Sequence, residues 1–284
     1  MIVTSASAGT LDAATVVTVN GPRDLPQDWG WFDWPRAEAE VRRLRQRIFT
    51  ASRAGDHRKV RSLQRLMLRS KANAMVATRR VTQINQGRRT AGIDGLTALS
   101  GPDRVELALS VQQGGHRPPA LPVRRIYIPK ANGKQRPLGI PVIADRVSQA
   151  VVLNALEPEW EARFEPRSYG FRPGRGCHDA IEAIFTVCKG KNPTRAWILD
   201  ADLTAAFDRI DHDRLLDHLH GFPARESVHR WLKAGVIENR RYAPTTEGTP
   251  QGGVISPLLM NIALHGMETA AGVRYKPWRS TPCC

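Results

Sequence analysis

The chain has 284 residues and carries 42 lysines and arginines against 27 aspartates and glutamates, which gives a net charge of +15. This length allows one large domain or two ordinary ones with a substantial core. No apolar run reaches the roughly eighteen residues of a membrane span, and the N-terminus lacks the basic start of a signal peptide. We therefore expect a cytoplasmic protein without a membrane partner, and the positive charge favours a polyanion such as nucleic acid.

The cysteines show no C-x-x-C pair with a matching histidine cluster, so we expect them to be reduced and not to bind metal. They are Cys177, Cys188, Cys283 and Cys284. Cys177 stands beside His178, and such a pair is compatible with a nucleophile or a zinc ligand. Adjacent residues on a helix point in different directions, however, which makes that interpretation the weaker one.

The N-terminal third of the chain is predicted to be helical after an unpatterned start. Residues 1–30 are expected to form a disordered tail, although the tryptophans of QDWGWFDWP are expected to dock on the fold. Apolar residues then recur at helical spacing over residues 35–77, with a break at AGD, where Asp56 can cap the second helix. We assign residues 31–94 to a basic helical N-terminal domain and residues 95–284 to a second domain.

The helical region has a marked imbalance of charge. Residues 36–89 contain 16 arginines and lysines against three acids. A solvated helix face is the simpler explanation, but such a face usually mixes charges, whereas a face that follows phosphates does not. We therefore expect RNA or DNA contact through Arg42, Arg43, Arg58, Arg61, Arg65, Arg79, Arg80, Arg88 and Arg89.

The second domain mixes strands and helices. After a short helix near residues 103–110, VRRIYIP and KQRPLGIP flank KANG, which predicts a β-hairpin. Helices are expected over residues 143–156 and 178–188, the latter with an inward face. That face comprises Ile181, Ile184, Phe185 and Cys188.

The remaining elements show no regular alternation of strand and helix. AWILDAD is predicted to be a buried strand and DHDRLLDHL a helix capped by Asp211. ESVHRWLKAGVI is predicted to be a helix, YAPTTEGTPQGG a loop or hairpin arm, and ISPLLMNIALHGMETA a helix with Pro257 in its first turn. This order favours an α+β fold over a doubly wound sheet.

Two aspartates at the end of the predicted strand suggest a metal site. Residues two apart on a strand share a face, so Asp200 and Asp202 would point the same way. Magnesium is usually held by one or two carboxylates together with substrate phosphates. A strand exit followed by a capped helix explains the same pattern equally well. The glycines around Gln251, in GTPQGG, and the cations of the hairpin favour the metal and phosphate interpretation.

Five segments in order resemble the sequence blocks of bacterial group II intron reverse transcriptases, also called intron maturases. They are RRVTQINQGRRTAGIDG, RRIYIPKANGKQRPLGIPVIADRVSQ, FEPRSYGFRPGRGCHDAI, LDADLTAAFDRIDHDRLL and GTPQGGVISPLLMNIAL, and the resemblance covers about residues 34–267. It implies the fingers and an incomplete palm of a right-hand polymerase, preceded by a basic helical extension. The implied partners are intron RNA, an RNA template with a DNA primer, and deoxynucleoside triphosphates.

The resemblance implies a role for several residues of the metal site. Asp202 matches the first catalytic aspartate, which binds both Mg2+ ions, and the Leu203 carbonyl matches an auxiliary ligand. Asp200 has no catalytic counterpart and is expected to be structural or to face solvent. The implied reaction is attack of a primer 3′-hydroxyl on the α-phosphate of a nucleotide, with two metals about 4 Å apart.

The nucleotide-binding roles follow from the same resemblance. Phe207 matches the aromatic gate that crowds a ribose 2′-hydroxyl and so selects deoxynucleotides. Lys130 and Arg136 match the fingers cations that contact the triphosphate. Gln251 matches the residue beside the nucleotide and the template strand.

The sequence departs from the family at its second catalytic block, an aromatic-x-Asp-Asp motif. The chain contains no Asp-Asp pair, and its tail from about residue 278 does not resemble the family. We therefore expect a truncated, catalytically incomplete copy. The alternative is a non-catalytic RNA-binding splicing helper, which should leave no aromatic-x-Asp-Asp remnant encoded downstream of residue 284. The five ordered blocks disfavour a third interpretation, a basic ribosome-associated protein. The sequence does not indicate an oligomeric state.

The purified chain is expected not to extend a DNA primer on an RNA template with Mg2+ and deoxynucleotides. The reason is that one aspartate can hardly hold two magnesium ions in the geometry of in-line attack. Primer extension on a sequencing gel measures this, with a heat-inactivated sample as the blank. Clear templated synthesis would contradict the prediction.

Overall fold

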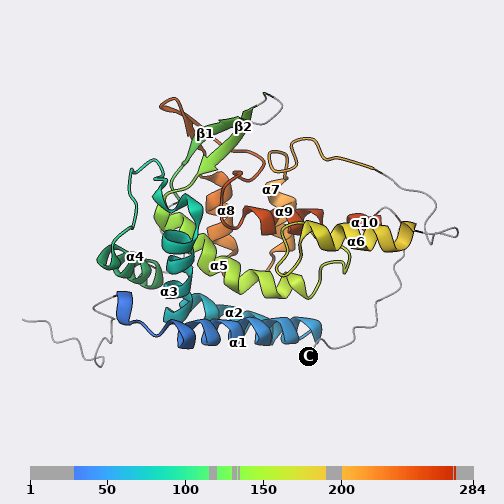
Figure 1. Cartoon of the computed structure of the whole chain (residues 1–284), viewed down its shortest axis with the longest axis horizontal. Helices are drawn as coiled ribbons and strands as arrows, with labels where there is room; N and C mark the ends of the chain where they lie inside the picture. Colours follow the sequence, from blue (N-terminus) through green and yellow to red (C-terminus); the bar gives the residue numbers. More distant parts are fainter. Residues whose placement is uncertain are drawn as a thin grey trace, which may run out of the picture.

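The structure is a computed structural model that describes residues 29–114, 120–129, 133, 135–189, 200–270 and 272. Within these residues, helices and a small mixed sheet lie around one long buried helix (Figure 1). The predicted α+β class is confirmed. The predicted disordered tail lies outside the described residues, except for Trp29 and Gly30, which begin a short 3-10 helix, Trp29–Trp31.

Three helices form the N-terminal part of the fold. They are α1 (Trp34–Arg53), α2 (His57–Arg69) and α3 (Lys71–Arg79). Each is capped by a side-chain oxygen that accepts a bond from a backbone N–H of the first turn. The capping residues are Asp33, Asp56 and Ser70 respectively. The predicted break and the capping by Asp56 are confirmed, and Ser70 adds a second break that the apolar spacing did not show.

The tryptophan-rich segment docks in part. Trp29 is 6% exposed and packs with Met75 of α3 and with Ala108 of α4 (Gly101–Gln113). Trp31, two residues later, is 88% exposed. The helix predicted near residues 103–110 is thus confirmed as α4. It is longer at both ends, and it begins at residue 101 because Ser100 and Asp103 form a capping box.

The predicted hairpin is confirmed and belongs to a larger sheet. The strands are β1 (Val123–Pro129), β2 (Gln135–Ile140), β3 (Val236–Glu238) and β4 (Arg241–Ala243). Their order is β2-β1-β3-β4, with β1 antiparallel to β2 and parallel to β3. The helix predicted through residue 237 ends earlier, as α8 (Arg225–Lys233), since Gly235 has a φ of +82° and Val236 pairs with Val123.

Helix α5 (Ile143–Glu161) is the centre of the molecule and is buried on nearly every side. It extends five residues beyond the predicted end at residue 156, with Pro158 in its interior. Helices α1, α2 and α3 pack against it, and Figure 1 shows α1 and α2 side by side below it, away from the hairpin. One continuous apolar core therefore joins the N-terminal helices to the rest of the chain.

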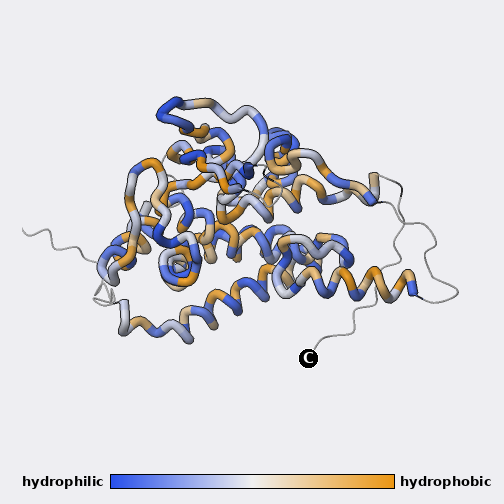
Figure 2. Tube along the Cα trace, turned by 45° about the horizontal axis from the view of Figure 1, so that its top comes forward, coloured by the Kyte–Doolittle hydropathy of each residue, from blue (hydrophilic) through white to orange (hydrophobic). Residues whose placement is uncertain are grey.

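The predicted inward face of α6 (Cys177–Cys188) is wrong for the described structure. Ile181, Ile184 and Phe185 are 60%, 57% and 62% exposed, and no residue of this helix is buried. Cys188 is half-buried. Figure 2 shows hydrophobic residues along this helix, which lies at the edge of the molecule. The amphipathic pattern therefore predicted the helix correctly, but no described segment covers its apolar face.

The predicted buried strand AWILDAD is also not found in the part that can be compared. Residues 196–199 of this segment lie outside the described residues, and Asp200 and Asp202 have no strand structure and are exposed. No neighbouring strand pairs with them among the described residues, so alternation alone did not suffice to place them in a sheet. The expectation that Asp200 faces solvent agrees with its exposure.

Three helices complete the fold. They are α7 (His212–His218), α9 (Ser256–Leu264) and α10 (Met267–Ala270). Capping of α7 by Asp211 is confirmed, since its carboxylate accepts a bond from the Arg214 N–H at 2.9 Å. Pro257 lies in the first turn of α9 as predicted. The single helix expected here is divided at Gly266, which has a φ of +88°.

Asn73→Ala is expected to destabilise the fold by about 2–4 kcal/mol, because it leaves buried polar groups without partners. Asn73 is fully buried, and its amide donates to the carbonyls of Met67 and Val151 and accepts from Asn154 at 2.7 Å. Urea unfolding measures the change. Arg47→Ala, on the exposed side of α1, is the control, with an expected change below about 0.5 kcal/mol. Equal effects of the two changes would contradict the prediction.

Candidate active site

Three distant segments meet through backbone hydrogen bonds. The Thr249 N–H donates to the Phe207 carbonyl at 2.7 Å, and the Gly248 N–H donates to the Ile210 carbonyl at 2.8 Å. The Gly139 N–H of β2 donates to the Gln251 carbonyl at 2.7 Å. The loop of residues 248–253 therefore lies between the β1–β2 hairpin and the segment of residues 207–210.

Two glycines make this close approach possible. Gly248 has a φ of +81°, and a Cβ there would lie 2.7 Å from the Asp208 carbonyl oxygen. Gly252 has a φ of +118°, and a Cβ there would lie 2.8 Å from the Gly139 carbonyl oxygen. Both positions need glycine because of the backbone conformation and because of the space. The glycines that we took to favour the metal and phosphate interpretation thus serve backbone packing here.

Two side chains from other elements anchor the same loop. Gln149 of α5 accepts a bond from the Val254 N–H at 2.9 Å. His212, which is 3% exposed, lies with Nε2 at 2.6 Å from the Gly248 carbonyl oxygen. A carbonyl only accepts, so Nε2 carries the proton. Burial lowers the pKa of His212, which favours this neutral form.

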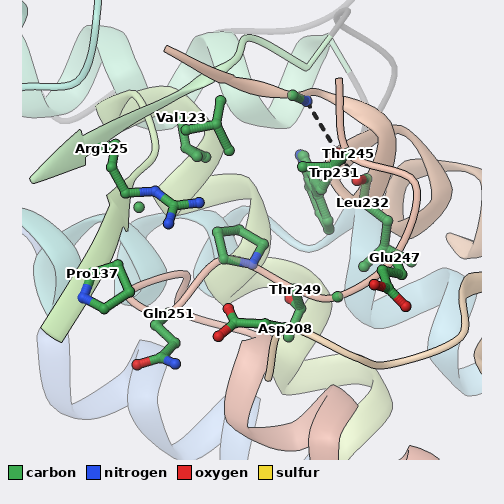
Figure 3. A pocket seen from close by; sticks show the side chains of 15 residues that line it. Val123, Arg125, Pro137, Asp208, Trp231, Leu232, Thr245, Glu247, Thr249 and Gln251 are labelled. Carbon is green, nitrogen blue, oxygen red and sulfur yellow. Dashed lines mark hydrogen bonds between the residues drawn. The ribbon is translucent and has the colours of Figure 1, made fainter. Parts of the chain in front are cut away.

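The loop and the hairpin also meet through side chains. Arg136 donates from Nε to the Gln251 side-chain oxygen at 3.2 Å, so the structure brings these two predicted residues together. Beside them is a pocket of about 230 Å³ whose lining includes Arg125, Asp208 and Gln251. Figure 3 shows Arg125 extending from β1 toward the pocket, with Asp208 and Gln251 across from it. Charged and hydrogen-bonding groups thus face a common space at the edge of the sheet.

The predicted metal ligands lie on an open segment. Asp202 and Leu203 are both exposed, and they precede Phe207 on a stretch without regular structure. A carboxylate and a carbonyl suit a hard cation whose remaining positions are filled by water and phosphate. Within the described ranges, no group of three or more His, Cys, Asp or Glu residues is arranged to hold a metal ion. The role of Asp202 and Leu203 as metal ligands therefore stays a prediction.

The other predicted residues fall into three groups. Lys130 lies outside the described residues, so its contact with a triphosphate stays a prediction. Arg61 donates to the His220 carbonyl at 3.1 Å, and Arg79 pairs with Glu38 at 2.9 Å. These two arginines hold the protein's own groups, and Arg88 is half-buried. The exposed members of the predicted set are Arg42, Arg43, Arg58, Arg65, Arg80 and Arg89.

Two models of known protein families match this chain. Residues 29–111 match the model of the N-terminal domain of reverse transcriptase, and residues 128–275 match the model of reverse transcriptase (RNA-dependent DNA polymerase). The chain belongs to the reverse transcriptase family. Its fold is therefore the fingers and palm of a right-hand polymerase after a helical N-terminal part, and enzymes of this family use a divalent metal. The first match extends past the boundary that we placed at residue 94.

The similar proteins include intron-encoded ones. Protein YkfC of Escherichia coli is 37% identical over 83% of this chain and 63% of its own length. The group II intron-encoded protein LtrA of Lactococcus lactis is 39% identical over 65% of this chain and 31% of its own. Maturase-like protein 1 of Euglena gracilis is 27% identical over 86% and 53% respectively. The chain thus spans between 31% and 63% of the length of these relatives.

The structure also identifies residues that the sequence did not indicate. Gln149 and His212 anchor the loop from buried positions, and Phe171 contacts the ring of Phe207. His212 stands in the stretch DRIDHDRLL, where it is indistinguishable from an ordinary helix residue. Its partner is 36 residues away, so no local pattern could reveal it.

The described helices include none long and apolar enough to cross a membrane.

His212→Gln is expected to reduce the loss of stability on acidification. The pKa of His212 is lowered on folding, so the unfolded chain takes up a proton more readily, and stability falls as the pH drops below about 6.5. Glutamine can still donate to Gly248 but does not titrate. Thermal unfolding from pH 7.5 to 5.5 measures both proteins, and the remaining groups are common to both. An equal fall in the melting temperature of the two proteins between pH 7.5 and 5.5 would contradict the prediction.

Proposed function

We propose that this chain is the nucleotide- and RNA-binding part of an RNA-directed DNA polymerase of the group II intron kind, with maturase-type binding of intron RNA, and that it does not polymerise by itself. The observation that supports this most directly is that the loop of residues 248–253 is bonded to both other segments. Gln251 accepts a bond from Arg136 of β2, and Thr249 donates to the Phe207 carbonyl. Arg136, Gln251 and Phe207 come from the three places that the family resemblance marks for nucleotide contact. The names of LtrA and of Maturase-like protein 1 support the intron connection.

In this proposal the hairpin and the loop bind the incoming deoxynucleotide. Arg136, together with Lys130, neutralises the triphosphate, since a guanidinium suits bidentate contact with phosphate oxygens. Gln251 lies beside the base in this proposal, and the bond from Arg136 links the two side chains. Phe207 fills the space that a ribose 2′-hydroxyl would need. This arrangement selects deoxynucleotides by shape.

Asp202 and the Leu203 carbonyl would hold Mg2+ at the open segment before Phe207. The metal, when bound, stabilises the charge on the attacking and leaving oxygens of the transferred phosphate. The exposure of both residues leaves room for the primer end and the triphosphate. Further carboxylates are required for a two-metal site, because the described residues form no cluster of three ligands.

The exposed arginines of the N-terminal helices are proposed to contact the RNA backbone. Arg58 and Arg65 are seven residues apart on α2 and so share a face of that helix, and Arg42 and Arg43 are exposed on α1, which packs against α2. Structured RNA is recognised largely through its backbone and shape, which suits arginines without a base-reading motif. The second candidate function, a non-catalytic splicing helper, uses this surface alone and is favoured by the incomplete metal site.

Binding of an RNA template annealed to a DNA primer tests both parts of the proposal. Replacing Arg42, Arg43, Arg58 and Arg65 by alanine is expected to weaken binding and to lower the slope of log K against log salt by about 0.7–0.9 for each phosphate that the variant no longer neutralises. The matched control removes four exposed arginines elsewhere, Arg209, Arg214, Arg240 and Arg241. Equal weakening in both variants would contradict the assignment to the helices.

The nucleotide arm of the same experiment separates the two candidate functions. The complementary deoxynucleotide, with Mg2+, is expected to stabilise the complex against a heparin challenge, and a mismatched one is not. Arg136→Ala should abolish this stabilisation without changing binding of the template alone. Binding of RNA without any response to the matched nucleotide would favour the splicing helper.

A further inference from the structure

Phe171 combines a backbone conformation and an exposure that folding does not favour. Its φ is +57°, in the left-handed region, and its side chain is 59% exposed. A Cβ makes this conformation unfavourable, and an exposed ring gains little from burial. Strain of this kind persists where the surroundings enforce it, and it is concentrated at functional sites.

The next residue provides much of that enforcement. Arg172 is 5% exposed, and its Nε and Nη2 donate to the Glu161 carboxylate at the end of α5, at 3.0 and 2.8 Å. Its Nη1 donates to the carbonyls of Glu165 at 2.7 Å and Ser168 at 3.2 Å. A buried guanidinium with this many partners holds the loop of residues 165–172 in one conformation.

The preceding residue is held as well. The Asn261 side chain of α9 donates to the Gly170 carbonyl at 2.9 Å. Phe171 therefore lies between two anchored residues, one tied to α5 and one tied to α9. The loop presents its ring to the surface as a consequence.

The exposed ring of Phe171 lies against Phe207. The ring centroids are 6.0 Å apart and the planes meet at 76°, which is the edge-to-face geometry that aromatic pairs prefer. The backbone of Phe207 is held by the bond that the Thr249 N–H donates to its carbonyl. Among the described residues, Phe171 is the aromatic ring found in contact with Phe207. The backbone of Phe207 is thus positioned by the loop, and its side chain by Phe171.

We propose that Phe171 is a positioning residue that sets the orientation of the Phe207 ring and so contributes to the choice between deoxy- and ribonucleotides. This inference rests on the proposed function, in which Phe207 is the gate. A gate excludes a 2′-hydroxyl only while its ring stays in place, and an anchored neighbour at the edge of the ring limits its rotamers. The strain at Phe171 is maintained for this contact.

Phe171→Gly separates positioning from folding. Glycine adopts a φ of +57° without steric cost, so the variant removes the ring and relieves the strain together. Its melting temperature is expected to equal or exceed that of the unchanged chain. Its preference for a deoxynucleotide is nevertheless expected to fall about two- to tenfold, the range that an aromatic pair provides. A residue that merely supported the fold would show changes of the same sign in both measurements.

The assay uses the full chain on an RNA template whose DNA primer ends in a dideoxynucleotide, so that no bond formation is needed. Complementary deoxy- or ribonucleoside triphosphate is titrated with Mg2+, and the complex that survives heparin is counted. Phe171→Tyr, which keeps the ring edge, is expected to retain the preference. Phe207→Ala is the control that reports on the gate itself.

The outcomes distinguish this inference from the function on which it rests. If Phe207→Ala loses the preference and Phe171→Gly keeps it, the positioning role is wrong and the gate stands. If the unchanged chain shows no preference, or Phe207→Ala keeps it, the gate fails and the positioning role fails with it. A lower melting temperature of Phe171→Gly, together with a lower melting temperature of Phe171→Tyr, would mean that the ring supports the fold. This outcome would also overturn the proposal.

Discussion

The buried helix α5 has to satisfy its polar side chains inside the protein, and the rest of the structure depends on how it does so. Asp145, Arg146, Gln149 and Asn154 are each less than a tenth exposed. A buried polar group without a partner costs free energy, so each of these side chains fixes the segment that supplies its partner. Desolvation also raises the pKa of Asp145, whose carboxylate accepts from the Leu121 N–H and the Trp231 indole.

The segments fixed in this way are those that form the site. Arg146 donates to the carbonyls of Gly87 and Thr90, at the end of the basic N-terminal region. Gln149 holds the loop that carries Gln251, and Asn154 bonds to Asn73 of α3. One helix thus connects the helices proposed to contact RNA with the loop proposed to contact the nucleotide. The N-terminal part and the polymerase part share a core and are not independent units.

The site itself shows rigidity that folding alone does not require. Glycines at positions 248 and 252 allow backbones to approach within a distance that a Cβ would forbid, and Phe171 keeps a strained conformation at the surface. By contrast, Asp202 lies on an exposed segment with few described partners. The part of the site proposed to bind the nucleotide is therefore held by many bonds, while the segment proposed to bind the metal is open.

Local physics made much of the fold predictable from the residues alone. Three kinds of feature follow from hydrogen bonding and hydrophobic spacing within a few residues, and all are found. They are the caps at Asp56 and Asp211, the hairpin strands on either side of KANG, and the helix from residue 143. The family could also be identified, because five motifs in order carry information that no single element does. The predicted contacts of Arg61 and Arg79 with RNA were less secure, since charge does not show what a side chain already binds.

Contacts between distant segments followed only from the folded chain. The pairing of β3 with β1, the bond of His212 to Gly248 and the contact of Phe171 with Phe207 each join residues more than thirty positions apart. The inward face of α6 was wrong for a related reason, because an amphipathic pattern states which side is apolar and not what will cover it. The strand expected around Asp200 can be compared only at residues 200–202, which form no strand. Local preference acts along the chain, whereas burial and partner choice depend on which surfaces the whole fold brings together.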